Sequence, residues 1–109
     1  MIMNIRTDEE IQDRIRQSEM ILLYFGAETC SVCHSMKPKV REIVSKHPNI
    51  EKIEIDVAEN TEIAGKFQIF TIPAILFFID GKETIREARY FSMEQIEEKI
   101  EWYYQMYYE

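Results

Sequence analysis

The sequence predicts an α/β fold in which a central mixed β-sheet carries helices on both faces. Segments with helical and strand patterns alternate in the first part of the chain, which indicates a parallel crossover connection. Toward the end, two strand-like segments flank Asp80-Gly81, a dipeptide typical of a two-residue antiparallel hairpin. A sheet with both kinds of pairing is mixed, and its parallel part needs helices on both faces.

Length and charge limit the possible classes of protein. The chain has 109 residues, which we expect to form one domain over residues 1–109. Thirteen basic residues against 20 acidic ones give a net charge of −7, whereas nucleic acids and anionic membranes need clustered positive charge in a partner. The first ten residues contain no long apolar stretch, and no apolar run elsewhere approaches the ~18 residues of a membrane span. We therefore expect a soluble, monomeric, cytoplasmic protein that binds neither nucleic acid nor membrane.

Helix and strand signals in the first half of the chain are clear. Thr7-Asp8-Glu9-Glu10 is a capping box that opens a helix expected to fade near Ser18. Residues 20–25 are apolar without alternation, which predicts a strand covered on both faces. A longer helix is predicted over residues 31–46, with a kink at Pro38 because proline has no N–H for the helical ladder.

A strand, a short helix and a second apolar strand follow. Residues 50–56 alternate in polarity, as expected for a strand with one buried side. Asn60 is expected to cap a short helix that runs to about Phe67. Pro73 then leads into residues 74–79, which are apolar throughout and predict another buried strand.

The last elements are a return strand and a helix. The return strand of the hairpin is predicted over residues 83–89, and a second capping box, Ser92-Met93-Glu94-Gln95, opens a helix that runs to the chain end. Apolar residues at helical spacing define the core-facing side of this helix: Met93, Ile96, Ile100, Tyr103 and Tyr107. Trp102 and Met106 fall on a different face, where they form either a partner surface or isolated exposed side chains.

The segment Cys30-Ser31-Val32-Cys33 lies where the first predicted strand turns into the long helix. These are the only cysteines, so any intramolecular disulfide joins Cys30 to Cys33. In a cytoplasmic chain this spacing indicates catalysis or metal binding rather than a structural staple. Backbone N–H groups and the helix dipole lower the pKa of a thiol at a helix N-terminus, which is where Cys30 lies. We therefore expect Cys30 to be the nucleophile and Cys33, one turn inside the helix, to resolve the mixed disulfide.

Several motifs together resemble the thioredoxin family over about residues 5–105. They are residues 25–33, Pro38, Asp56, Thr71-Ile72-Pro73 and Asp80-Gly81, in this order and spacing. The resemblance implies a thioredoxin fold and a thiol–disulfide oxidoreductase that reduces the disulfides of client proteins. It implies that the Ile72–Pro73 bond is cis, and that this loop lies against the sulfurs and offers backbone groups to an extended substrate segment. It also implies that no cofactor or metal is bound, with electrons from an NADPH-dependent thioredoxin reductase or a low-molecular-weight thiol.

The chain departs from the family pattern at positions that tune the site. Ser31 and Val32 replace the usual Gly-Pro, and a Ser31 hydrogen bond to the thiolate would make the protein more oxidising. In the family, a buried acid and a nearby lysine help to deprotonate the resolving cysteine. Tyr24 replaces this acid here, and Lys52 matches the lysine. Arg89 replaces a glycine, which puts a cation beside the docking groove and favours acidic clients. The residues expected to contact substrate are Thr29, Ser31, Val32, Thr71, Ile72, Pro73 and Arg89.

Three other interpretations of the cysteine pair stay open at this point. The chain is also consistent with a binding or adaptor module on the same fold, whose thiols act as a redox sensor or not at all. Cys30-x-x-Cys33-His34 spells the attachment motif of c-type haem. A zinc site would use Cys30, Cys33 and His34, with His47 or a carboxylate as the fourth ligand.

Overall fold

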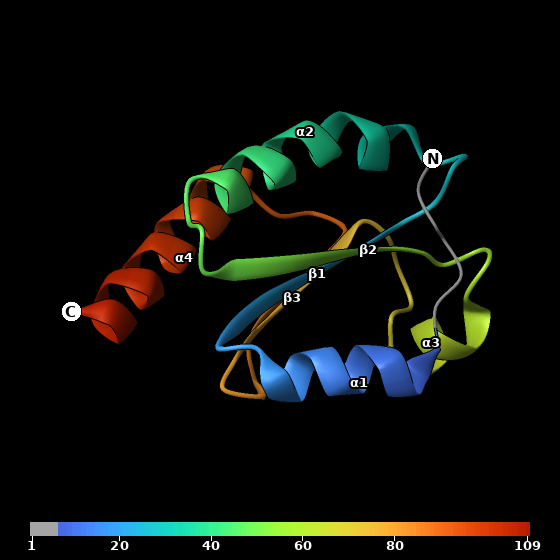
Figure 1. The fold of residues 1–109 in the computed structure, drawn as a ribbon. Helices are drawn as coiled ribbons and strands as arrows, with labels where there is room; N and C mark the ends of the chain where they lie inside the picture. Colours follow the sequence, from blue (N-terminus) through green and yellow to red (C-terminus); the bar gives the residue numbers. More distant parts are fainter. Residues whose placement is uncertain (1–6) are drawn as a thin grey trace.

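The computed structural model describes residues 7–109, in which a central sheet is covered by helices on both faces (Figure 1). The elements follow in the order α1 (Asp8–Gln17), β1 (Met20–Gly26), α2 (Ser31–Ser45), β2 (Ile50–Asp56), α3 (Thr61–Lys66), β3 (Ala74–Ile79), β4 (Lys82–Ala88) and α4 (Met93–Tyr108). Among these residues no helix is long and apolar enough to cross a membrane. The predicted order of elements is confirmed.

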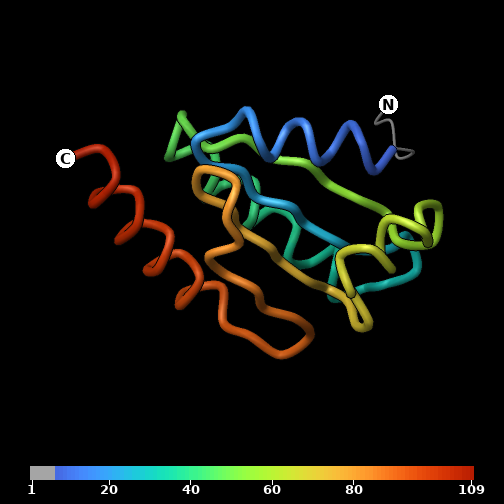
Figure 2. Tube along the Cα trace, turned by 90° about the horizontal axis from the view of Figure 1, so that it is seen from below, coloured from blue at the N-terminus to red at the C-terminus, as the bar shows by residue number. Residues whose placement is uncertain are grey.

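The sheet is mixed, with the strand order β2-β1-β3-β4. β1 pairs with β2 in parallel and with β3 in antiparallel, and β3 pairs with β4 in antiparallel. The hairpin turn between β3 and β4 has positive φ angles at Asp80 (51°) and Gly81 (82°), as a type I′ turn requires. Seen from below, the chain passes from β4 through a loop into α4, whose C-terminal end extends beyond the sheet (Figure 2).

Two apolar layers enclose the sheet. Alternate residues of β1 face opposite sides, so Leu23 packs with α1 and α3, while Leu22 packs with α2 and α4. All of β1 is buried, which confirms the strand predicted to be covered on both faces. On α4, Ile96 and Ile100 are buried, and the aromatic residues of the same face pack partly against the core. Trp102 and Met106 are exposed, as expected for the other face.

The observed ends of the helices and strands confirm some predicted caps and bounds and correct others. Thr7 and Ser92 are confirmed as N-cap residues, since their hydroxyls accept hydrogen bonds from the N–H groups three residues later, at 3.1 and 3.3 Å. Asn60 precedes α3 but makes no side-chain cap, and its amide N–H donates to the Asp56 carbonyl at 3.0 Å. β4 ends one residue early, at Ala88, because Arg89 has a φ of 71° that breaks the extended chain. Pro38 lies inside α2, which is one helix from end to end, and the expected kink stays a prediction.

Two glycines in different backbone conformations predict opposite effects of the same substitution. Gly81 has a left-handed φ of 82°, so G81A should cost about 1–2 kcal/mol of unfolding free energy. Gly65 lies in α3 with open space around its Cα, so G65A should gain about 0.5–1 kcal/mol. Chemical denaturation of both variants measures the two differences, and a G81A variant as stable as the wild type would contradict the turn assignment.

Candidate functional site

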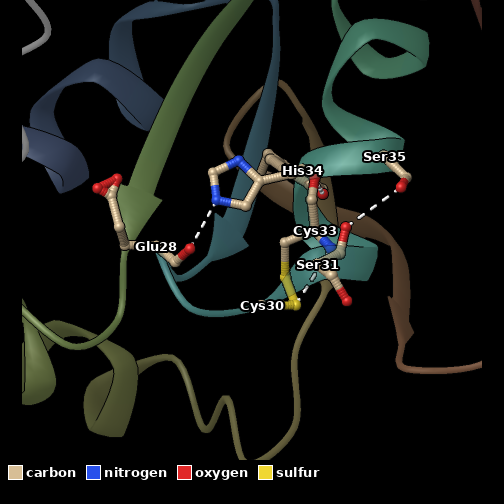
Figure 3. The surroundings of a disulfide bond; sticks show 7 residues. Glu28, Cys30, Ser31, Cys33, His34 and Ser35 are labelled. Atoms are coloured by element: carbon tan, nitrogen blue, oxygen red, sulfur yellow. Dashed lines mark hydrogen bonds between the residues drawn. A yellow bond between two sulfur atoms is a disulfide. The ribbon is translucent and has the colours of Figure 1, made fainter.

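Cys30 and Cys33 form a disulfide at the N-terminus of α2, with their Cα atoms 5.2 Å apart (Figure 3). Cys30 is the N-cap residue of the helix, and its Sγ accepts a hydrogen bond of 3.1 Å from the Cys33 N–H. Cys33 is buried, at 2% exposure, whereas Cys30 is partly exposed. The two sulfurs therefore differ in access to solvent, although they lie within one turn of the same helix.

Two residues at the carboxyl end of β1 contact Cys33 on its buried side. The Tyr24 hydroxyl donates to the Cys33 carbonyl oxygen at 2.7 Å, and this bond is buried. Gly26 lies so close that a Cβ there would be 3.1 Å from the Cys33 Cβ and 3.3 Å from its Sγ. A larger residue at position 26 would have to displace Cys33, so the glycine is what allows this close approach.

A cluster of three charges lies beside this contact. Glu54 accepts hydrogen bonds from Arg41 at 2.7 and 2.8 Å and from Lys52 at 2.7 Å, and its side chain is only 12% exposed. These cations hold the pKa of Glu54 near 2, although burial opposes the shift. Burial and the nearby Glu54 charge raise the pKa of Tyr24 to about 12. Neither group therefore exchanges a proton near neutral pH.

Sequence reasoning missed Glu54 and Arg41. The family resemblance implies that Lys52 lies near a buried acid at position 24, but here Lys52 pairs with Glu54 on its own strand. Glu54 lies opposite Tyr24 in the sheet register. The only signal in the sequence was the spacing of two between Lys52 and Glu54, which places both side chains on one side of a strand.

A cavity of about 370 Å³ opens beside the buried cysteine. Its walls include Tyr24 and Gly26 of β1, Cys33 and Lys37 of α2, and the end of β2. His34 also lines it, and its Nε2 lies 2.7 Å from the Glu28 carbonyl oxygen (Figure 3). The cavity is thus lined by charged side chains and by one of the two cysteines of the disulfide.

The residues predicted to contact substrate lie at the same end of the sheet. Thr29, Ser31 and Val32 are exposed around the disulfide. The Ile72–Pro73 bond is cis, and the pairing of Phe25 with Ala74 brings Pro73 to the end of β1 from which α2 departs.

Arg89 and Thr71 complete this group. The Arg89 N–H donates to the Pro73 carbonyl at 2.8 Å, and its guanidinium lies 4.9 Å from the centre of the Tyr90 ring. Thr71 is partly exposed two residues before Pro73. The Ser31 carbonyl accepts from Ser35, whereas the predicted bond from the Ser31 hydroxyl concerns the thiolate of the reduced form and stays a prediction.

The geometry does not bring together the ligands of the zinc interpretation, and the haem interpretation is not tested by it. Both sulfurs are joined to each other in this form. His34 is directed at Glu28, and His47 is buried beyond the C-terminal end of α2, where it bonds the Ile43 carbonyl. Within residues 7–109 no three potential ligands among His, Cys, Asp and Glu lie close enough to hold a metal ion.

Comparison with known proteins now decides the family. A model of the thioredoxin family matches residues 2–102. The chain belongs to the thioredoxin family. It is 38% identical to thioredoxin-like protein YdfQ of Bacillus subtilis over 97 residues, which are 89% of this chain and 87% of that protein. It is 26% identical to thioredoxin-1 of Saccharomyces cerevisiae over 86 residues, which are 79% and 84% of the two chains.

Solved thioredoxin structures agree with this fold. Thioredoxin 1 from Thermosipho africanus superposes with a TM-score of 0.76 at 31% identity, and the match covers 82% of this chain and 99% of that one. A mutant thioredoxin from Halobacterium salinarum superposes with a TM-score of 0.81 at 22% identity over 91% and 87% of the two chains, which supports the fold alone. Together with the Cys30–Cys33 pair, the family makes this chain a thiol–disulfide oxidoreductase of the thioredoxin type.

The low pKa of Glu54 predicts a stability change in acid. A carboxyl whose pKa falls from 4.5 to about 2 on folding stabilises the protein above pH 4.5, and this contribution is lost as the pH falls toward 2. E54Q should therefore cost about 1–3 kcal/mol at neutral pH, and the gap to the wild type should close in acid. Denaturant unfolding across this range measures the gap. E51Q removes an exposed carboxylate of the same strand that is paired with Arg14 at 2.6 Å, and it serves as the control. A gap for E54Q that does not change with pH would contradict the assignment.

Proposed function

We propose that the protein reduces disulfide bonds of client proteins through a Cys30–Cys33 dithiol–disulfide cycle. The observation that carries the proposal is the asymmetric cysteine pair at the N-terminus of α2 in a thioredoxin-family chain. Cys30 is partly exposed, so its sulfur can react with a client disulfide. Cys33 is buried at 2% exposure, so its sulfur can react only with Cys30.

The first step is attack by the Cys30 thiolate. The Cys33 N–H donates to its Sγ and the N-terminus of α2 faces it, and both features favour the charged form of a thiol. A bond forms between Cys30 Sγ and one client sulfur, while the other client sulfur leaves as a thiolate. The product is a mixed disulfide.

The second step is attack by Cys33 on Cys30 Sγ. The Cys30–client bond breaks, the Cys30–Cys33 disulfide forms, and the second client sulfur leaves. Two electrons have then passed from the protein dithiol to the client disulfide. The oxidised pair in the structure corresponds to the end of this cycle.

The surroundings of the pair support an extended client segment as substrate. Val32 is 54% exposed and offers an apolar contact beside the sulfurs. Ile72 and Pro73 lie at the same end of the sheet, where the backbone of Ile72 would bind the client chain. Arg89 is held next to Pro73 by a backbone hydrogen bond, and its charge would favour acidic clients.

Regeneration of the dithiol needs an electron donor. We assign this role to an NADPH-dependent thioredoxin reductase or a low-molecular-weight thiol, with the protein acting as a cytoplasmic monomer in electron transport and redox homeostasis. The net charge of −7 supports protein clients over nucleic acids or anionic membranes.

Serine variants of the two cysteines test the proposal. C30S should lower turnover of a generic protein disulfide to background, because no attacking sulfur remains. C33S should accumulate one covalent mixed disulfide per chain, visible by intact mass and on non-reducing gels. The control is S35A, which changes an exposed residue of the same helix and should leave turnover unchanged. If neither cysteine variant alters turnover, the chain is instead a redox-sensing or inert binding module.

A further inference from the structure

Cys33 must lose its thiol proton before it can attack the mixed disulfide. Cys33 is 2% exposed, so bulk water does not reach its sulfur freely. A thiol must lose its proton to become the attacking thiolate. The proton therefore leaves through the cavity of about 370 Å³ that Cys33 lines.

Most titratable groups facing this cavity are poor proton acceptors at neutral pH. Tyr24 of β1 already donates its proton to the Cys33 carbonyl. Glu54 of β2 is bound on both oxygens by cations, and Lys37 of α2 is itself a cation. Asp56, the last residue of β2, accepts hydrogen bonds at Oδ1 from the backbone N–H groups of Ala58 and Glu59.

The remaining groups are Glu28 and His34. The Glu28 side chain belongs to an exposed residue of the loop before α2, and its carbonyl oxygen accepts from His34 Nε2 at 2.7 Å. A carbonyl can only accept, so Nε2 carries a proton and the neutral ring keeps its lone pair on Nδ1. None of the hydrogen bonds recorded for residues 7–109 uses Nδ1. Histidine is also the side chain that normally exchanges a proton near neutral pH.

We propose that His34 accepts the proton of the Cys33 thiol, through water in the cavity, when Cys33 attacks the mixed disulfide. The inference rests on the proposed dithiol cycle and adds a proton-transfer residue to its second step. Cys33 Sγ forms its bond to Cys30 Sγ, the client sulfur leaves, and the proton passes from Cys33 to Nδ1. It then goes to the departing client thiolate or to solvent, so charge and electrons balance. A cavity of this size with polar walls has room for the bridging water.

The arrangement fits a site in which position 24 carries no acid. Tyr24 fills that place with a hydroxyl whose hydrogen bond fixes α2, and the nearby carboxylate, Glu54, is neutralised by cations. His34 directly follows Cys33, so the first turn of α2 carries both the thiol and its proton acceptor.

The test separates the two steps with dithiobis-nitrobenzoate, an aromatic disulfide whose thiolate product is coloured. In stopped flow, reduced protein releases one equivalent when Cys30 attacks and a second when Cys33 resolves the mixed disulfide. The variant H34Q keeps an N–H donor for the Glu28 carbonyl but has no titrating group. The second phase should slow about 10²-fold at neutral pH in H34Q, while the first phase stays unchanged.

The pH profile distinguishes proton transfer from a structural effect. As the pH rises, the wild-type second-phase rate should reach a plateau, because His34 replaces hydroxide as the proton acceptor. In H34Q the same rate should rise about tenfold per pH unit, following the thiolate fraction. K37Q removes a cation from the same cavity wall and should keep the plateau, and H34N provides a second variant if H34Q is unstable.

Each outcome points to a different conclusion. A plateau that survives in both H34Q and H34N overturns the role of His34 and leaves the dithiol cycle intact. A second phase that persists in C33S, or a first phase that persists in C30S, would instead overturn the cycle itself. Loss of the plateau in K37Q as well as in H34Q would show an effect of charge and would also contradict the proposal.

Discussion

The active end of this protein depends on the contact between the carboxyl end of β1 and the first turn of α2. Tyr24 bonds the Cys33 carbonyl, and Gly26 leaves no side chain between the strand and the Cys33 sulfur. Because β1 is buried along its whole length, this contact fixes Cys33 inside the fold. Cys30, as the helix N-cap, stays at the surface. The unequal access of the two sulfurs, on which an ordered two-step cycle depends, follows from this one contact.

Charge around the site is organised by β2. Glu54 binds cations from its own strand and from α2, which joins the helix to the sheet on the side of the cavity. A carboxylate held in this way contributes to stability but is a weak base. Structural and proton-transfer roles therefore belong to different residues. Tyr24 and Glu54 bind α2 to the sheet, and the proposed proton acceptor is His34.

The sequence was informative wherever local pattern and burial agree. The continuous apolar run of β1, the N-cap residues Thr7 and Ser92, and the Asp80-Gly81 turn each depend on short-range chemistry that is visible in the residues themselves. Hydrogen bonds and ion pairs between side chains of different elements could not be predicted in this way. Arg41 reaches Glu54 only because α2 crosses β2, and Asn60 turns its amide back to β2 instead of capping α3. The direction of the His34 ring depends likewise on where the loop before α2 places a carbonyl.

The central claim is that the Cys30–Cys33 pair works as a reductant of protein disulfides. Its most direct test is the reduction potential of the pair, measured by equilibrating the protein with a thiol–disulfide buffer and quantifying the two forms by mass. We expect a value nearer the ~−270 mV of thioredoxin than the ~−180 mV of disulfide isomerases. A value between about −180 and −120 mV would make the protein an oxidant or a sensor and would contradict this account.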